Sequence, residues 1–205
     1  MDASRDKSEY LDAIWINTLR QLAPGAAARP IIENAWKLGN GESCLSYAEA
    51  RDFSNRYLPE GTGREALAKA TGLDERLLEP SLASLEAFLG KTEQAAEVVC
   101  RLDTLQKKDE TAQSRDFAWA NLAGKLQGPA KTLVNYAADL GYPDAGYSLA
   151  SAASFVKSYL LGELTAKGIS KYSGISVSGV ENGINSIKES VLLASEMAGK
   201  RAILG

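Results

Sequence analysis

Apolar residues recur at every third or fourth position along nearly the whole chain, which is the spacing of one buried face on an α-helix. In the first such run the apolar residues are Leu11, Ile14, Trp15, Leu19 and Leu22. The sequence shows no convincing alternation of apolar and polar residues combined with Asn-Gly or Asp-Gly turns, which together would indicate β-hairpins. The sequence therefore predicts an all-α, multi-helix fold in which strands are at most a minor element.

Helix start and stop signals divide this pattern into segments. Ser46 and Glu49 have the spacing of a capping box, which predicts a helix that ends near Tyr57. Thr62 and Glu65 repeat the same start signal. An earlier helix begins at Pro30, and the later helices are predicted at 75–88, 92–108, 114–127, 130–140, 146–162, 166–172 and 178–197.

The chain has 205 residues and contains no histidine, and this absence limits its chemistry. It excludes Ser-His-Asp and Cys-His nucleophile systems and the paired-histidine zinc protease motif. Cys44 and Cys100 are too few to complete a four-ligand zinc site. We therefore expect no catalytic residues, no metal site and no cofactor. An enzyme that uses only Asp, Glu, Lys, Tyr or Ser stays as a third alternative.

The distribution of charge separates two parts of the chain. Residues 1–116 carry 15 basic and 20 acidic side chains, a net of −5, whereas residues 117–205 carry 8 and 6, a net of +2. A polar stretch at 106–116 lies between them. We expect an acidic helical region over 1–110 and a second helical region over 111–205, or one domain that combines both.

Two features of the sequence bear on location. The first ten residues mix acids with bases, and they lack the basic start and apolar run of a signal peptide. The most apolar stretch, 149–164, is too short and too polar to span a bilayer. Together with the low cysteine content, these features predict a cytoplasmic protein with no membrane partner.

The segment 163–189 has the pattern of a helix-turn-helix unit. Such a unit needs a small residue where its helices touch, a glycine in the turn and apolar residues that seat the second helix. Ser170 and Gly174 meet the first two needs, and Ser176 or Ser178 can cap the second helix. The apolar residues predicted to be buried are Ile169, Ile175, Val180, Ile184 and Ile187.

The run from Ser170 to Ser176 resembles the helix-turn-helix of lactose-repressor-type regulators. Val180 and Ile184 make the segment similar to the quorum-sensing and response-regulator class as well. Either resemblance implies a second helix in the DNA major groove. The residues then expected to face the bases are Ser178, Glu181, Asn182 and Asn185. The residues expected to neutralise phosphates are Lys167, Lys171 and Lys188.

These residue types suit their implied roles. An asparagine side chain can make a paired contact with adenine, a glutamate can accept a hydrogen bond from cytosine, and lysines pair with phosphate. Glu181 also brings negative charge near phosphates. Gly179 and Gly183 lie inside the second helix, and each costs about 1 kcal/mol relative to alanine.

A second segment, 63–88, is similar to the helix-turn-helix of winged-helix regulators. The similarity rests on the run Leu67, Ala68, Thr71, Gly72 and Leu73. Its second helix presents mostly acidic side chains, which repel phosphate. We expect this pair of helices to serve packing or protein contact.

Together these observations predict a non-catalytic, DNA-binding regulatory protein that uses a C-terminal helix-turn-helix and acts as a homo-oligomer, most simply a homodimer. The alternative is a helical adaptor or inhibitor that binds a macromolecular protein partner without touching DNA. The acidic first region favours this alternative.

Overall fold

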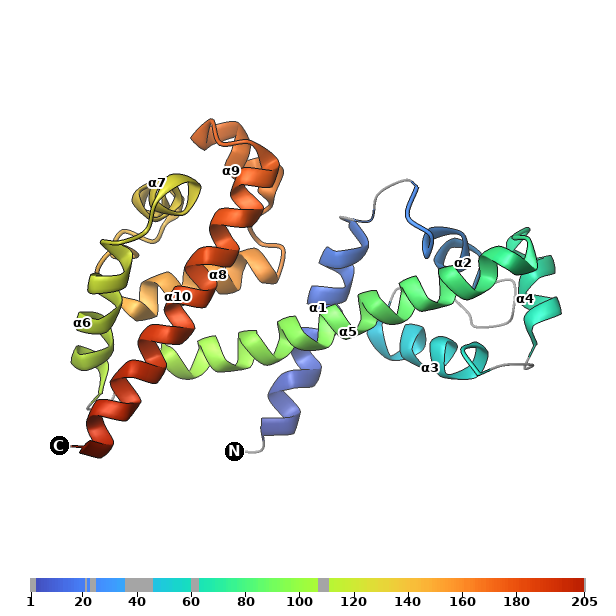
Figure 1. Ribbon diagram of the computed structural model, residues 1–205, viewed down its shortest axis with the longest axis horizontal. Coiled ribbons are helices and arrows are strands. Elements are labelled where there is room, and N and C mark those ends of the chain that lie inside the picture. The colour runs from blue at the N-terminus through green and yellow to red at the C-terminus, as the bar shows by residue number, and fades with distance from the viewer. Residues whose placement is uncertain are drawn as a thin grey trace. The chain divides into compact units, whose positions relative to one another are not determined.

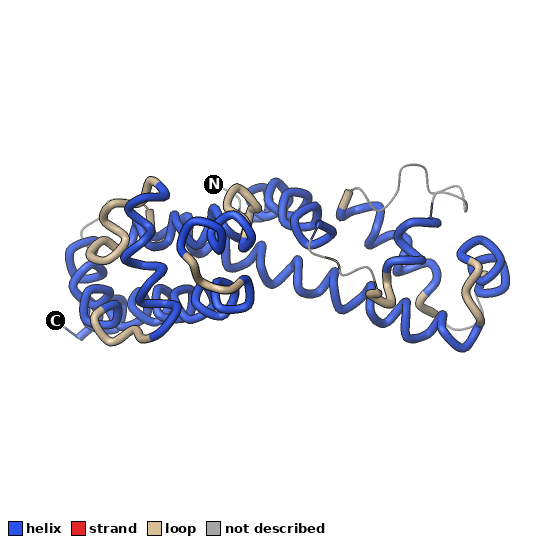
Figure 2. Tube along the Cα trace, turned by 90° about the horizontal axis from the view of Figure 1, so that it is seen from above, coloured by secondary structure: helices blue, strands red, loops and turns tan. Residues whose placement is uncertain are grey.

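The computed structural model describes residues 3–20, 22, 25–35, 46–59, 63–106 and 111–204. Every regular element in these ranges is a helix, and none is a strand (Figures 1 and 2). The predicted all-α fold is confirmed. The predicted start signal at Thr62 lies outside the described residues.

The chain divides into two compact units, Met1–Glu97 and Val98–Gly205. The boundary between them falls inside one helix, α5 (Glu75–Leu105), upstream of the polar stretch that suggested a boundary near residue 110. The first unit carries 11 basic and 16 acidic side chains, a net of −5, and the second carries 12 and 10, a net of +2. The contrast in charge seen in the sequence is therefore a contrast between two folded units.

The first unit is built around the N-terminal three-quarters of α5. Its other helices are α1 (Ala3–Arg20), α2 (Arg29–Asn34), α3 (Tyr47–Tyr57) and α4 (Arg64–Thr71). Its core side chains are almost wholly shielded from solvent and include Trp15, Ile31, Phe53, Leu67, Leu78, Leu82, Leu85 and Leu89. The burial of Trp15 agrees with its predicted role as a core anchor.

The second unit is built around a long C-terminal helix, α10 (Val177–Leu204), against which α6, α7, α8 and α9 all pack. These helices are α6 (Ala112–Ala123), α7 (Gly128–Tyr136), α8 (Leu149–Leu160) and α9 (Ala166–Ser173), and the 3₁₀ helix η2 (Ala137–Leu140) follows α7. Trp119 is fully buried, and its indole Nε1 donates to the Ala145 carbonyl at 2.8 Å. This bond ties α6 to the turn that follows η2.

Two local predictions differ from the structure in detail. The predicted helices 75–88 and 92–108 are a single helix, α5, because Gly90 keeps a helical backbone and does not end it. At the start of α3 the Ser46 hydroxyl accepts from the Glu49 amide at 3.2 Å, as a capping box requires. The Glu49 carboxylate, however, accepts from the Ser46 hydroxyl at 2.7 Å.

Within the described part of the chain, no helix combines the length and the hydropathy that crossing a bilayer requires.

Candidate nucleic-acid interface

The helices α9 and α10 form a helix-turn-helix. Hydrogen bonds from its own side chains and backbone cap both helices and fix the turn between them. The Thr165 hydroxyl caps α9 by accepting from the Gly168 amide at 3.1 Å. Gly174 ends α9 with a φ of 71°, a left-handed conformation that favours glycine, and its amide donates to the Ser170 carbonyl at 3.0 Å. The Ser176 hydroxyl then accepts from the Gly179 amide at 3.1 Å, so Ser176 caps α10.

The apolar residues that seat this pair are buried nearly as the sequence predicts. Ile169 of α9 and the α10 side chains Val180, Ile184 and Ile187 are all shielded from solvent, and Ile175 in the turn is half-buried. Since these residues occupy one side of α10, its other side is left to face solvent.

All four residues expected to face bases lie on that outer side of α10. Ser178, Glu181, Asn182 and Asn185 are exposed within its first three turns. The side-chain amide of Asn182 makes no hydrogen bond with any residue that the structure describes. The Asn185 Oδ1 accepts from the Lys188 ammonium at 3.1 Å, so these two side chains form a pair.

The two lysines of α9 are also exposed, one turn apart, on a helix that contains no acidic residue. Neither Lys167 nor Lys171 forms an ion pair with a described residue. The Lys171 ammonium lies 5.8 Å from the centre of the exposed Tyr172 ring. Lys188, on α10, is half-buried. The α9 lysines are therefore available to a negatively charged partner.

Two of the glycines inside α10, Gly179 and Gly183, have a packing role that the sequence did not reveal. A Cβ on Gly183 would lie 2.5 Å from the Leu133 Cδ1 and 3.1 Å from the Ala130 backbone nitrogen. A Cβ on Gly179 would lie 2.8 Å from the Ile175 Cγ2. At Gly183 the first turn of α7 thus packs directly on the backbone of α10, whereas at Gly179 the close neighbours belong to the turn that precedes α10.

Glu181 is the unfavourable member of the set for a DNA contact. Its carboxylate forms no ion pair with a described residue, and its negative charge acts on the Tyr159 side chain of α8. Burial raises the pKa of the Tyr159 phenol, and the negative charge of Glu181 raises it further. Tyr159 therefore stays protonated near neutral pH. The exposed Glu181 side chain has no ion-pair partner among the described residues.

The pair α4–α5 repeats the local plan of α9–α10. An eight-residue helix is followed by a left-handed glycine, Gly72 with a φ of 69°, and then by a long helix that buries Leu78, Leu82 and Leu85. Asp74, just before α5, and Glu75 and Glu79 in its first turns are exposed, and Arg76 is the one exposed base among them. The winged-helix-like segment is thus a helix pair with an acidic surface.

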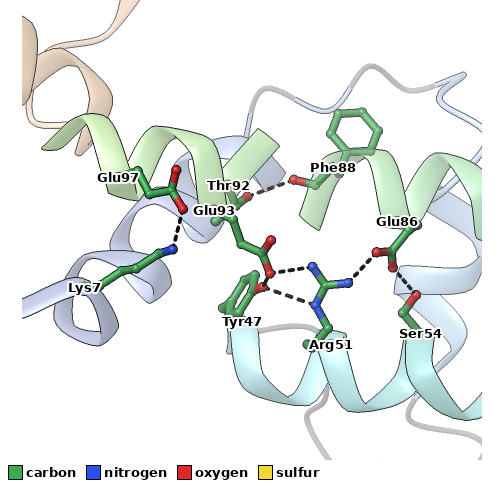
Figure 3. Close-up of polar contacts among 9 residues, drawn as sticks. All are labelled: Lys7, Tyr47, Arg51, Ser54, Glu86, Phe88, Thr92, Glu93 and Glu97. Carbon is green, nitrogen blue, oxygen red and sulfur yellow. Dashed lines mark hydrogen bonds and ion pairs between the residues drawn. The ribbon is translucent and has the colours of Figure 1, made fainter. Parts of the chain in front are cut away.

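The densest polar cluster of the first unit joins α3 to α5 (Figure 3). The Arg51 guanidinium lies between two carboxylates, with Glu86 on one side and Glu93, at 2.6 Å, on the other. The Tyr47 hydroxyl donates to Glu93, and the Ser54 hydroxyl donates to Glu86 at 2.8 Å. These contacts attach one face of α3 to the middle of α5.

The pKa shifts in this cluster favour the protonation states that hold α3 against α5. The hydrogen bond from Tyr47 holds the pKa of the Glu93 carboxyl below its ordinary value, and the charge of Arg51 adds to this effect. Burial raises the pKa of the Tyr47 phenol, and its hydrogen bond to Glu93 raises it further. Burial alone lowers the pKa of Arg51, but its hydrogen bonds to Tyr47, Glu86 and Glu93 outweigh burial and raise it. Each charge is met by its opposite within the cluster.

A scan against protein-family models, a search of curated proteins and a search of solved structures each found no match to this chain. The class of this protein is therefore defined by its fold alone. It is an all-α protein of two units, each with a short helix, a glycine turn and a long helix, and the second pair exposes Lys167 and Lys171 together with Asn182 and Asn185.

Proposed function

We propose that the protein is a non-catalytic regulator that binds double-stranded DNA through α9 and α10. The observation that carries the proposal is the pairing of two kinds of exposed side chain. Among the described residues, Lys167 and Lys171 of α9 have no acidic partner, and the side-chain amide of Asn182, on the outer face of α10, makes no hydrogen bond. In a helix-turn-helix these are the positions that meet the phosphates and the base edges.

In this proposal each helix has a distinct task. The first turns of α10 enter the major groove, where Asn182 pairs with the N6 and N7 atoms of adenine and Glu181 accepts from a cytosine amine. The α9 lysines meet the flanking phosphates. Lys188 keeps Asn185 oriented through their 3.1 Å bond. The proposal assigns the protein to the cytoplasm, where its cysteines stay reduced.

The small number of lysines sets the expected strength of binding. One phosphate contact changes the logarithm of the binding constant by about 0.9 per tenfold change in salt, so it contributes about 15-fold at 50 mM salt relative to 1 M. The two α9 lysines of one copy supply only modest affinity on this scale. The protein would therefore act as a homo-oligomer, which multiplies these contacts.

The test is fluorescence anisotropy with a labelled random-sequence duplex at about 50 mM salt. We expect binding that weakens steeply with salt, and we expect Lys167→Glu and Lys171→Glu each to reduce affinity by at least tenfold. The matched control is Lys125→Glu, which changes another exposed lysine of the same unit outside the site and should bind like the wild type. If wild-type protein at micromolar concentration does not bind, the proposal is wrong.

Asn182→Ala tests base readout separately from affinity. We expect this variant to keep most of its random-sequence binding but to lose the preference recovered by selection from a random duplex pool. Unchanged selectivity would remove Asn182 from the proposed contact.

A second candidate function is that of an adaptor or inhibitor that binds a protein partner. It is favoured by the start of α5, where Leu77 is 53% exposed in a turn that also carries Asp74 and Glu75. Such a surface suits a basic partner with an apolar anchor. Affinity capture should then recover one stoichiometric partner that Leu77→Glu releases and that the α9 lysine variants retain.

A further inference from the structure

The C-terminal half of α10 carries an outward stripe that the proposed DNA contact does not use. Leu193 and Met197, one turn apart, are 47% and 38% exposed. Glu189 precedes them by one turn and Lys200 follows them by one turn, and both are exposed. At spacings of four, four and three residues, these four side chains share one face of the helix. We refer to them as the α10 stripe.

A neighbouring helix also carries a large exposed apolar side chain. Phe117 is exposed on α6, a helix that packs against α10. Large apolar side chains on two packed helices are costly to leave in water, and such patches mark interaction sites.

The charges at the two ends of the stripe indicate the occupant. Glu189 and Lys200 form no ion pair with any residue in the described part of the chain. The nearby Glu196 differs, since it pairs with Arg101 at 3.0 Å. The stripe thus presents a free negative charge at one end, a free positive charge at the other, and two apolar side chains between them.

We propose that a second copy of this chain docks on the α10 stripe with its own α10 antiparallel. In that arrangement Glu189 of each copy lies beside Lys200 of the other, and Leu193 and Met197 of both copies meet at the centre. Two-fold symmetry makes both charge pairs from one surface, as an isologous contact requires. A parallel arrangement would place Glu189 against Glu189 and Lys200 against Lys200.

This inference deepens the proposed function, because two copies double the lysines available to DNA. It does not depend on DNA, however, since self-association is measured without it. If the chain dimerises but does not bind DNA, only the proposed function is overturned. If the chain binds DNA as a monomer, only the proposed dimer is overturned.

The experiment is sedimentation equilibrium of the full chain between about 5 and 200 μM. We expect the wild type to approach twice the 21.9 kDa chain mass at the upper concentrations. Leu193→Glu and Met197→Glu should each raise the dimer dissociation constant by at least tenfold. Ile16→Glu is the matched control, because it places the same charge on a comparably exposed apolar residue of the other unit, and it should leave the dimer intact.

Charge reversals test the antiparallel arrangement without removing an apolar side chain. Glu189→Lys and Lys200→Glu should each weaken the dimer, and the double variant should restore it. All variants are compared by far-UV circular dichroism, so that loss of helix is distinguished from loss of association.

Three results would overturn the inference. They are a wild-type chain that stays at 21.9 kDa at 200 μM, a dimer that the Leu193→Glu variant leaves unchanged, and an Ile16→Glu variant that dissociates to the same extent. A double charge variant that remains weak would overturn the antiparallel arrangement.

Discussion

Replacing Gly183 with alanine tests the close packing of α7 on α10. The added methyl group would lie 2.5 Å from the Leu133 Cδ1, and it would lie 3.1 Å from two backbone atoms, the Ala130 nitrogen and the Pro129 carbonyl carbon. The leucine can turn away, but the two backbone atoms can move only if the first turn of α7 moves. Overpacking of this kind costs about 1–3 kcal/mol, whereas alanine gains about 1 kcal/mol of helix propensity over glycine. We expect a net loss of up to about 2 kcal/mol.

Gly199→Ala is the matched control, because Gly199 lies in the same helix and a Cβ there would have no atom within 4 Å. Only the propensity term then acts, so this variant should gain up to about 1 kcal/mol. Thermal unfolding followed by circular dichroism gives the sign of each change, and hydrogen exchange of the α7 amides assigns the effect to the second unit. The reasoning is refuted if Gly183→Ala is as stable as Gly199→Ala.

Three further outcomes follow from the described contacts. Ser176→Ala should destabilise the second unit by about 1 kcal/mol in urea titrations, while Ser178→Ala should change little, because only the Ser176 hydroxyl caps α10. Trp119→Phe should cost about 1 kcal/mol in the same titrations, because the Ala145 carbonyl loses its indole donor. The attachment of α3, read by its hydrogen exchange, should depend on pH at both extremes. The pKa of Glu93 is lowered, so its contribution is complete above 4.5 and is lost as the pH falls through the lowered value. The pKa of Tyr47 is raised, so its contribution is complete below 10.0 and is lost as the pH rises through the raised value. A flat pH profile of α3 exchange protection, after correction for intrinsic rates, would contradict the last of these.

Local signals in the sequence predicted the helix-turn-helix closely. Gly174 ends α9 and Ile184 is buried in α10, as residue type and spacing indicated. These features depend on neighbours within a few residues, and they can be read from one segment alone. The outward positions of Asn182 and Lys171 follow from the same periodicity.

The long-range features could not be predicted in this way. Gly183 looked like a weakness in a recognition helix, because the residue that needs its small size, Leu133, lies fifty positions earlier in the chain. The cluster of Arg51 with Glu86 and Glu93 likewise joins segments that have no detectable relation in the sequence. Charge composition indicated two parts, but it placed their boundary in a polar stretch, whereas the boundary lies in a helix.

That boundary governs how the protein can be taken apart. Many multidomain chains are joined by exposed linkers that a protease cuts first, and expression of separate domains usually begins from such a cut. Here the division between Glu97 and Val98 runs through the hydrogen-bonded backbone of α5. A fragment of the second unit must keep the last turns of α5, because Leu102 and Leu105 belong to its core. A protease that needs extended backbone cannot bind the helical backbone at the boundary. We therefore expect limited digestion to leave α5 uncut there, so that the two units stay joined.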